Sequence, residues 1–147
     1  MQNVPILTDR SALERNRARA ARMVEPAMFL QDEARHEIKE RLKEVNRTFT
    51  APAIVTGFPD QWQGLLPDAH VVPDTETLNL TPVAHDLVIH AMGMQWANDP
   101  VGQSAQSRRA LKPDGLFLAV FFGGQTLQEL RDVLTRAEAA ETGGLSP

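Results

Sequence analysis

The sequence has 147 residues, of which 42% are hydrophobic and 23% charged, with a formal net charge of −4 and no cysteine. This length fits one domain that is large enough to bury a substantial core. The absence of cysteine excludes a disulfide scaffold, a cysteine zinc site, an iron–sulfur cluster and a thiol nucleophile.

The longest unbroken apolar run, from Leu116 to Phe122, is far shorter than the ~20 residues of a membrane-spanning helix. The first residues contain no apolar segment of the kind found in secretory signals. An isoelectric point near 5.5 does not favour nucleic acid as a partner. We therefore expect a protein without a membrane span, without a nucleic-acid partner, in a reducing cytoplasmic setting.

Charge divides the chain into three parts. Residues 1–50 hold ten Lys or Arg and eight Asp or Glu, whereas residues 51–107 hold six acids and no Lys or Arg. Five arginines cluster near the start, at positions 10, 15, 17, 19 and 22. They could contact an anionic surface or RNA. The interleaved acids favour the other interpretation, a solvated helix face.

The first part of the chain is predicted to be helical. Ser11 to Glu14 has the pattern of a capping box, which predicts a helix start near Ser11 and an end before Pro26. A second helix is predicted over residues 30–45, because apolar residues recur there mostly four positions apart. These residues are Leu30, Ala34, Ile38, Leu42 and Val45.

The rest of the chain alternates strands with helices. Continuous apolar runs, typical of strands buried on both faces of a parallel sheet, occupy residues 53–56, 69–72, 86–91 and 116–122. Asp99-Pro100 predicts a helix start, and the helix should end near Leu111 before a Lys-Pro-Asp-Gly turn. A last helix carries a stripe over Leu127–Ala137 and ends at Gly143-Gly144. This order predicts an α/β domain.

Several segments resemble class I S-adenosylmethionine (SAM) dependent methyltransferases. In particular, they resemble the branch that includes the biotin-pathway malonyl-carrier-protein O-methyltransferase and the methyltransferase-like assembly factor of respiratory complex I. The resemblance is carried by residues 9–47, 85–100, 108–118, 122–131 and 143–147. It implies a Rossmann-like parallel sheet, truncated at its end, with SAM as cofactor. Residues 1–50 would form an N-terminal helical extension, and residues 51–147 a partial α/β domain, together one structural unit.

The resemblance breaks at the loop that would hold the cofactor. Family members that bind SAM have an acid in the first strand and a glycine-rich turn after it, where this chain reads Ala53 to Gln61. Only Gly57 falls on a motif glycine. Val55 replaces the acid, and proline and glutamine stand at positions 59 and 61. Glycine permits close backbone approach, and proline lacks an N–H donor. Because each tenfold of affinity is worth about 1.4 kcal/mol, the loss of two or three contacts predicts weakened or lost SAM binding.

Position along the family pattern still predicts which residues would line a retained site. Besides Gly57, these are Ala91 and Met92 after the third strand and Asp74 after the second, where the family places the acid that binds the ribose hydroxyls. Asp74 could equally be an ordinary turn residue, and Glu76 could substitute for it. The pattern identifies no catalytic residue, and methyl transfer needs positioning more than a strong base.

Three other residues near these strands are candidates for a role at or beside the site. His90 lies near the carboxyl end of its strand, where open α/β sheets bind ligands, so it could line a pocket. Trp96 could form the wall of such a pocket, although core packing is favoured. Trp62 could fill the space that a glycine-rich loop leaves open. His85 and His90 point to opposite faces of one strand, which argues against a shared metal site.

Two functions follow from these observations. The first is a SAM-dependent methyltransferase-family protein with weakened or lost cofactor binding and an unidentified methyl acceptor. The alternative is a non-catalytic assembly or interaction protein with a methyltransferase shape; a hydroxylase-like activity, suggested by the complex I branch, would need the same cofactor pocket. Because the strand at residues 116–122 would form an uncovered sheet edge, we also expect a homodimer or a partner protein there.

Overall fold

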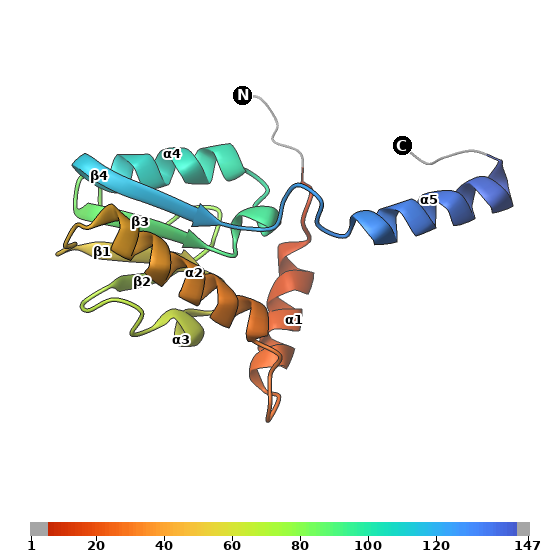
Figure 1. Ribbon diagram of the computed structural model, residues 1–147, viewed down its shortest axis with the longest axis horizontal. Coiled ribbons are helices and arrows are strands. Elements are labelled where there is room, and N and C mark those ends of the chain that lie inside the picture. Colours follow the sequence, from red (N-terminus) through yellow and green to blue (C-terminus); the bar gives the residue numbers. More distant parts are fainter. Residues whose placement is uncertain (1–5, 144–147) are drawn as a thin grey trace.

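A computed structural model describes residues 6–143, and the predicted role of Gly144 in ending the last helix lies outside them. The fold is α/β, with a single parallel sheet of four strands in the order β2-β1-β3-β4 and helices around it (Figure 1). This confirms the predicted fold class. The elements in chain order are α1 (Arg10–Ala21), α2 (Phe29–Val45), β1 (Pro52–Thr56), α3 (Pro59–Trp62), β2 (His70–Pro73), β3 (His85–Ala91), the 3₁₀ turn η1 (Met94–Trp96), α4 (Pro100–Ala110), β4 (Leu111–Val120) and α5 (Gln128–Thr142).

The two central strands are buried on both faces, as their continuous apolar runs predict. Every residue of β1 and of β3 is buried. Ile54 faces the core on the side of α2 and α3, whereas Ala53 and Val55 face the core on the side of α4. The predicted helix at residues 30–45 is confirmed as α2, whose Ala34 and Ile38 join the first of these cores.

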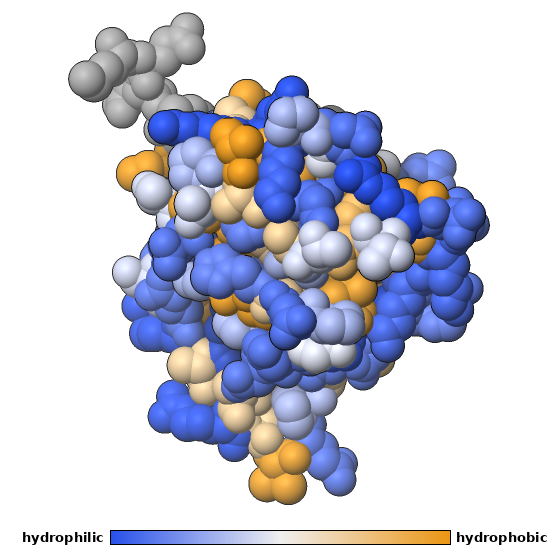
Figure 2. Space-filling model, turned by 90° about the vertical axis from the view of Figure 1, so that its left-hand side faces the viewer, coloured by the Kyte–Doolittle hydropathy of each residue, from blue (hydrophilic) through white to orange (hydrophobic). Residues whose placement is uncertain are grey.

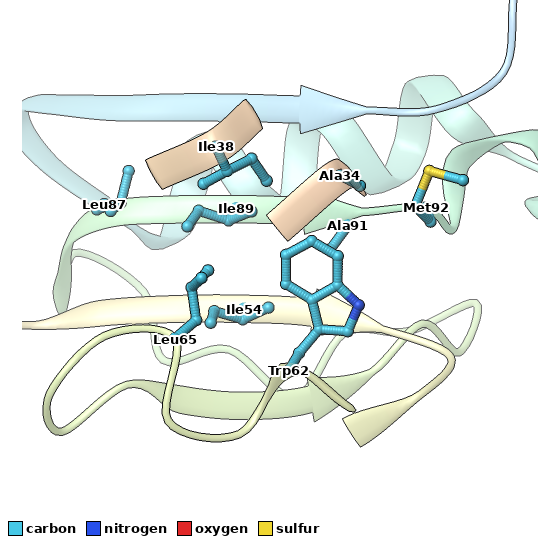
Figure 3. Packing of buried hydrophobic residues seen from close by; sticks show 9 residues of the cluster. All are labelled: Ala34, Ile38, Ile54, Trp62, Leu65, Leu87, Ile89, Ala91 and Met92. Carbon is cyan, nitrogen blue, oxygen red and sulfur yellow. The ribbon is translucent and has the colours of Figure 1, made fainter. Parts of the chain in front are cut away.

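Trp62 closes the core between α2 and the sheet. Its indole lies beside Ala34 and Ala91, and its side chain is fully buried (Figure 3). The indole Nε1 donates a hydrogen bond of 2.8 Å to Oε1 of the buried Gln31. Because a buried indole N–H needs a partner, this bond lets Trp62 fill the space after β1 without an unsatisfied donor.

Two helix starts illustrate local control by capping. The Asp99 side chain accepts a 2.7 Å hydrogen bond from the Gly102 N–H, which confirms the predicted start of α4. The predicted helix start near Ser11 is confirmed, but Ser11 is not the capping residue. The cap is Asp9, whose Oδ1 accepts from the Ala12 N–H at 2.9 Å, so α1 begins at Arg10.

The prediction of a separate turn at residues 112–115, between α4 and the last strand, is wrong. Strand β4 begins at Leu111, directly after α4, and ends at Val120 instead of Phe122. Leu111 pairs with His85 and Leu116 pairs with Leu87, so the residues between them bulge out of the ladder. Asp114 in this bulge has a φ of 63°. The turn chemistry is therefore present, but the strand pairs on both sides of it.

The two ends of the sheet differ in what covers them. Helix α1 lies across the end toward which the strands point, and α5 projects away from the rest of the molecule (Figure 1). The opposite end of the sheet, seen in Figure 2, presents mainly hydrophilic residues with scattered apolar ones. No residue of α5 is buried, and its predicted stripe includes Leu130 and Leu134, which are 50% and 58% exposed. Within residues 6–143, no helix is both long and apolar enough to cross a bilayer.

Candidate functional site

The strand order creates a crevice at the carboxyl end of the sheet. Strand β1 lies between β2 and β3, so the chain leaves β1 to one side and later crosses to the other. In open α/β sheets, ligands bind outside the carboxyl ends of the strands at such a switch point. Gly57 follows β1, Asp74 follows β2, and Ala91 ends β3 with Met92 after it. The structure thus brings the four predicted residues to one edge; their role as cofactor ligands stays a prediction.

An arginine from α1 occupies this edge. Arg17 donates to both carboxylate oxygens of Asp74, with Nη1–Oδ1 at 2.7 Å and Nη2–Oδ2 at 2.8 Å. Arg10 adds a longer contact, from Nη2 to the Asp74 backbone oxygen at 3.1 Å. The Asp74 side chain is 3% exposed and that of Arg17 13%. Bidentate arginine–carboxylate pairs are among the strongest hydrogen-bonded pairs in proteins, so Asp74 is already engaged.

The two arginines also set the protonation of Asp74. Burial by itself would raise the pKa of the carboxyl group. The hydrogen bonds and positive charge of Arg17, assisted by Arg10, outweigh burial and hold the pKa below its usual range. Asp74 is therefore ionised at neutral pH.

Gly57 is needed for space. A Cβ atom at this position would lie 2.1 Å from Cζ of Arg17, far inside van der Waals contact. The Arg17 guanidinium also lies over the ring of Phe58, with Cζ 5.6 Å from the ring centroid, within the range of a cation–π interaction. Asp74, Gly57 and Phe58 together form a seat for one guanidinium group, which we call the Arg17 seat.

The loop after β1 does not fit a bound SAM as it stands. The Phe58 N–H donates to Thr56 Oγ1 at 3.2 Å, and Pro59, which has no N–H, begins the four-residue helix α3. Val55 is fully buried in the apolar core, so nothing polar replaces the family's acid there. Asp74 is paired and Arg17 lies against Gly57, so the carboxylate and the space beside Gly57 that the cofactor would need are taken.

His90 does not line the site but packs beneath its surface, in the interior. Its side chain is fully buried, and Nε2 lies 2.8 Å from Oε1 of Gln103. Because Gln103 Nε2 donates to the Thr75 oxygen at 2.9 Å, its Oε1 must accept, which places the proton on His90 Nε2. Burial lowers the pKa of His90, so the ring is neutral at pH 7. This chain of contacts holds the segment after β2 against α4.

Trp96 lines an apolar groove beside the Arg17 seat. The groove has a volume of about 630 Å³ and runs between α1, the start of α2 and the carboxyl edge of the sheet. Trp96 is 42% exposed, so the favoured interpretation of core packing is wrong. Other lining residues include Leu13, Leu30, Phe58, Met92 and Phe122. Among residues 6–143, no group of three His, Asp or Glu side chains could hold a metal ion.

Sequence reasoning missed Arg10 and Arg17 as site residues. It treated the N-terminal cluster as a solvated face, with an anionic contact as the other interpretation. A signal was available in the charge distribution, because residues 51–107 contain six acids and no Lys or Arg. A buried carboxylate in that part that backbone N–H groups do not satisfy, as they do for Asp86, needs a cation from elsewhere in the chain. Which arginine supplies it depends on where α1 lies.

Comparison with known proteins shows which proteins this chain is similar to. The chain is 35% identical over 115 residues to the arginine-hydroxylase NDUFAF5, mitochondrial, of Danio rerio, a match covering 77% of the chain and 36% of that protein. The human protein of the same name is 29% identical over 95% of the chain and 48% of its own length. A malonyl-acyl-carrier-protein O-methyltransferase of Xylella fastidiosa is 36% identical over 50% of the chain and 25% of that enzyme.

The chain thus spans less than half of these relatives' length. No protein-family model and no solved structure matches it significantly. The methyltransferase relatives imply SAM use by the family, without direct evidence of a cofactor in this chain.

The Arg17 seat predicts a non-additive pair of substitutions. Arg17→Ala should lower the free energy of unfolding by about 3 kcal/mol, because it leaves a buried carboxylate with only its longer contact to Arg10. Gly57→Ala should cost about 1–3 kcal/mol in the wild type, because the new methyl group collides with the guanidinium. In the Arg17→Ala background the same change should cost less than about 0.5 kcal/mol.

Denaturant unfolding of the four proteins measures this cycle. Gly123→Ala is the matched control, because a Cβ at Gly123 meets nothing within 4 Å. Additive costs of the two substitutions would contradict the seat.

The pairing of Asp74 also predicts a dependence on pH. The free energy of unfolding should be higher for the wild type than for Asp74→Asn. This difference should have its full size above about pH 4, near the pKa of an unfolded aspartate. The excess should shrink as the pH falls toward the lower pKa of the folded state, because in this range the unfolded aspartate gains a proton and the paired, folded carboxylate does not. Urea unfolding at a series of pH values measures it, and an excess that is constant throughout acid titration would contradict the pairing.

Proposed function

We propose that this chain, which is a class I methyltransferase-like protein, has weakened or lost SAM binding and acts by binding another protein. One observation carries this proposal. Both carboxylate oxygens of Asp74, the residue in the position of the family's ribose-binding acid, are bound to Arg17. A ligand hydroxyl cannot replace a charged, bidentate partner without a large loss of electrostatic energy.

The loop after β1 supports the same conclusion. Proline at position 59 removes one backbone donor, and the N–H of Phe58 is used within the loop. Each missing contact costs affinity at about 1.4 kcal/mol per tenfold. The hydroxylase activity in the name of the NDUFAF5 relatives is not proposed for this chain, because it would depend on the same cofactor pocket.

A partner is proposed at the free edge of the sheet. Strand β4 pairs with β3 on one side, and no other strand within residues 6–143 covers its second side. Phe121 and Phe122, directly after it, are 52% and 38% exposed. An unpaired strand with apolar side chains is a surface on which another strand can pair. Either a second copy of the chain or a different protein would satisfy it.

Small-angle scattering over a concentration series tests the homodimer at this edge. A mass that rises toward twice that of the monomer is expected, and it should fall back when Ala119, which is exposed on β4, is replaced by lysine. A strictly monomeric profile at high concentration contradicts self-association and leaves a different protein as the partner.

We also keep a reducing, cytoplasmic compartment as a proposal, on the absence of cysteine in the sequence. The NDUFAF5 relatives are named as mitochondrial, which describes those proteins.

Calorimetric titration with SAM and with S-adenosylhomocysteine tests the loss of cofactor binding. We expect no binding at millimolar ligand by wild-type protein whose folding is verified by circular dichroism, because the Arg17 seat is filled and the loop lacks donors. Micromolar binding, or either compound carried through purification, would overturn the proposal and return attention to methyl acceptors.

A further inference from the structure

Helix α1 is held in place by polar contacts and not by a buried face. No residue of α1 is buried, and the apolar groove of about 630 Å³ lies between this helix and the rest of the molecule. Two anchors fix it. Arg10 and Arg17 bind Asp74, and the N–H groups of Leu7 and Thr8 each donate to Oδ1 of Asn98 at 2.8 Å. A helix with so little apolar burial separates from its core at low free-energy cost.

One of these anchors lies inside the candidate ligand site. The Arg17 guanidinium occupies the switch point, between Asp74 and the surface of Gly57, under the ring of Phe58. Any ligand that binds Asp74 through its hydroxyl groups must use the oxygens that Arg17 holds. Occupation of the site by α1 and occupation by a ligand therefore exclude each other.

We propose that α1 is an autoinhibitory latch: Arg17 is a tethered competitor that closes the site, and release of α1 opens it to a hydroxyl-bearing ligand of the SAM type. This deepens the proposed function and rests on its assignment of the site at Asp74. In this proposal, part of the loss of SAM affinity comes from the Arg17–Asp74 contact, which can open, and the rest comes from the loop after β1.

The size of the effect follows from the population of the open state. The apparent dissociation constant of a ligand rises by the inverse of the fraction of molecules that are competent to bind. An open fraction of about 1–10% corresponds to an apparent affinity that is ten- to a hundredfold weaker. Linkage makes the coupling reciprocal, so a ligand at Asp74 should loosen α1 by the same factor.

The test compares full-length variants on α1. Arg17→Ala removes the competitor, and Arg17→Lys keeps the charge but loses the bidentate fork. Arg15→Ala is the matched control, because Arg15 is an exposed arginine on the same helix. Calorimetry with S-adenosylhomocysteine should give an affinity at least tenfold above the wild type for Arg17→Ala, a smaller gain for Arg17→Lys, and the wild-type value for Arg15→Ala.

Hydrogen exchange supplies a readout that does not depend on the cofactor loop. Amides of α1 should exchange at least tenfold faster in Arg17→Ala than in the wild type or in Arg15→Ala, while those of β1 and β3 remain protected. Ethylguanidinium at millimolar concentration should compete with S-adenosylhomocysteine in Arg17→Ala by refilling the Arg17 seat. The same salt should not affect Arg15→Ala, whose seat is filled.

The outcomes separate the latch from the proposed function. Equal affinity of Arg17→Ala and the wild type, including no binding by either, overturns the latch and leaves the proposed loss of cofactor binding standing. Micromolar binding by the wild type overturns the proposed function, and the latch still stands if Arg17→Ala binds tenfold more tightly. If Arg17→Ala fails to fold, an affinity of Arg17→Lys equal to that of the wild type overturns the latch.

Discussion

The ion pair between Asp74 and Arg17 anchors α1 at the carboxyl edge of the sheet. The sheet would be the same without it, because β1 and β3 are held by apolar burial on both faces. The position of α1, in contrast, would change without the pair, since no residue of that helix is buried. Two hydrogen bonds of 2.7 and 2.8 Å thus help to fix this helix, together with the contacts of Arg10 and Asn98, and they place Arg17 against Gly57 and engage the acid after β2. Stability and closure of the site come from one contact.

The site has the position of a ligand-binding site but not its composition. Parallel strands bring Gly57, Asp74 and Met92 to one edge at a switch point, as in open α/β sheets in general. Several side chains and loop groups there are already engaged within the chain. Arg17 neutralises Asp74, the loop N–H of Phe58 is used by Thr56, and His90 serves Gln103. A fold can therefore keep the geometry of a family while its residues restrict the chemistry, since function resides in the site and not in the fold.

Much of the fold could be predicted because its signals are local. The stripe of α2, the cap at Asp99 and the continuous runs of β1 and β3 all depend on residues close in sequence. Predictions failed where pairing between distant segments overrode a local signal. The turn at Asp114 became a bulge because β3 pairs with β4 on both sides of it. Trp96 stayed exposed because nothing within residues 6–143 covers the groove it lines.

The sequence by itself determined the element types, the class of fold, the family resemblance and the defect of the loop at positions 55, 59 and 61. It also determined that residues 51–107 contain six acids but no Lys or Arg. Only the tertiary structure decided that Arg17 forms the bidentate pair with Asp74 across 57 positions of sequence, with Arg10 as the second, more distant cation. The physical reason is that helix periodicity and capping act over a few residues. The partner of a buried charge is instead set by which side chain the packed elements bring within hydrogen-bonding distance.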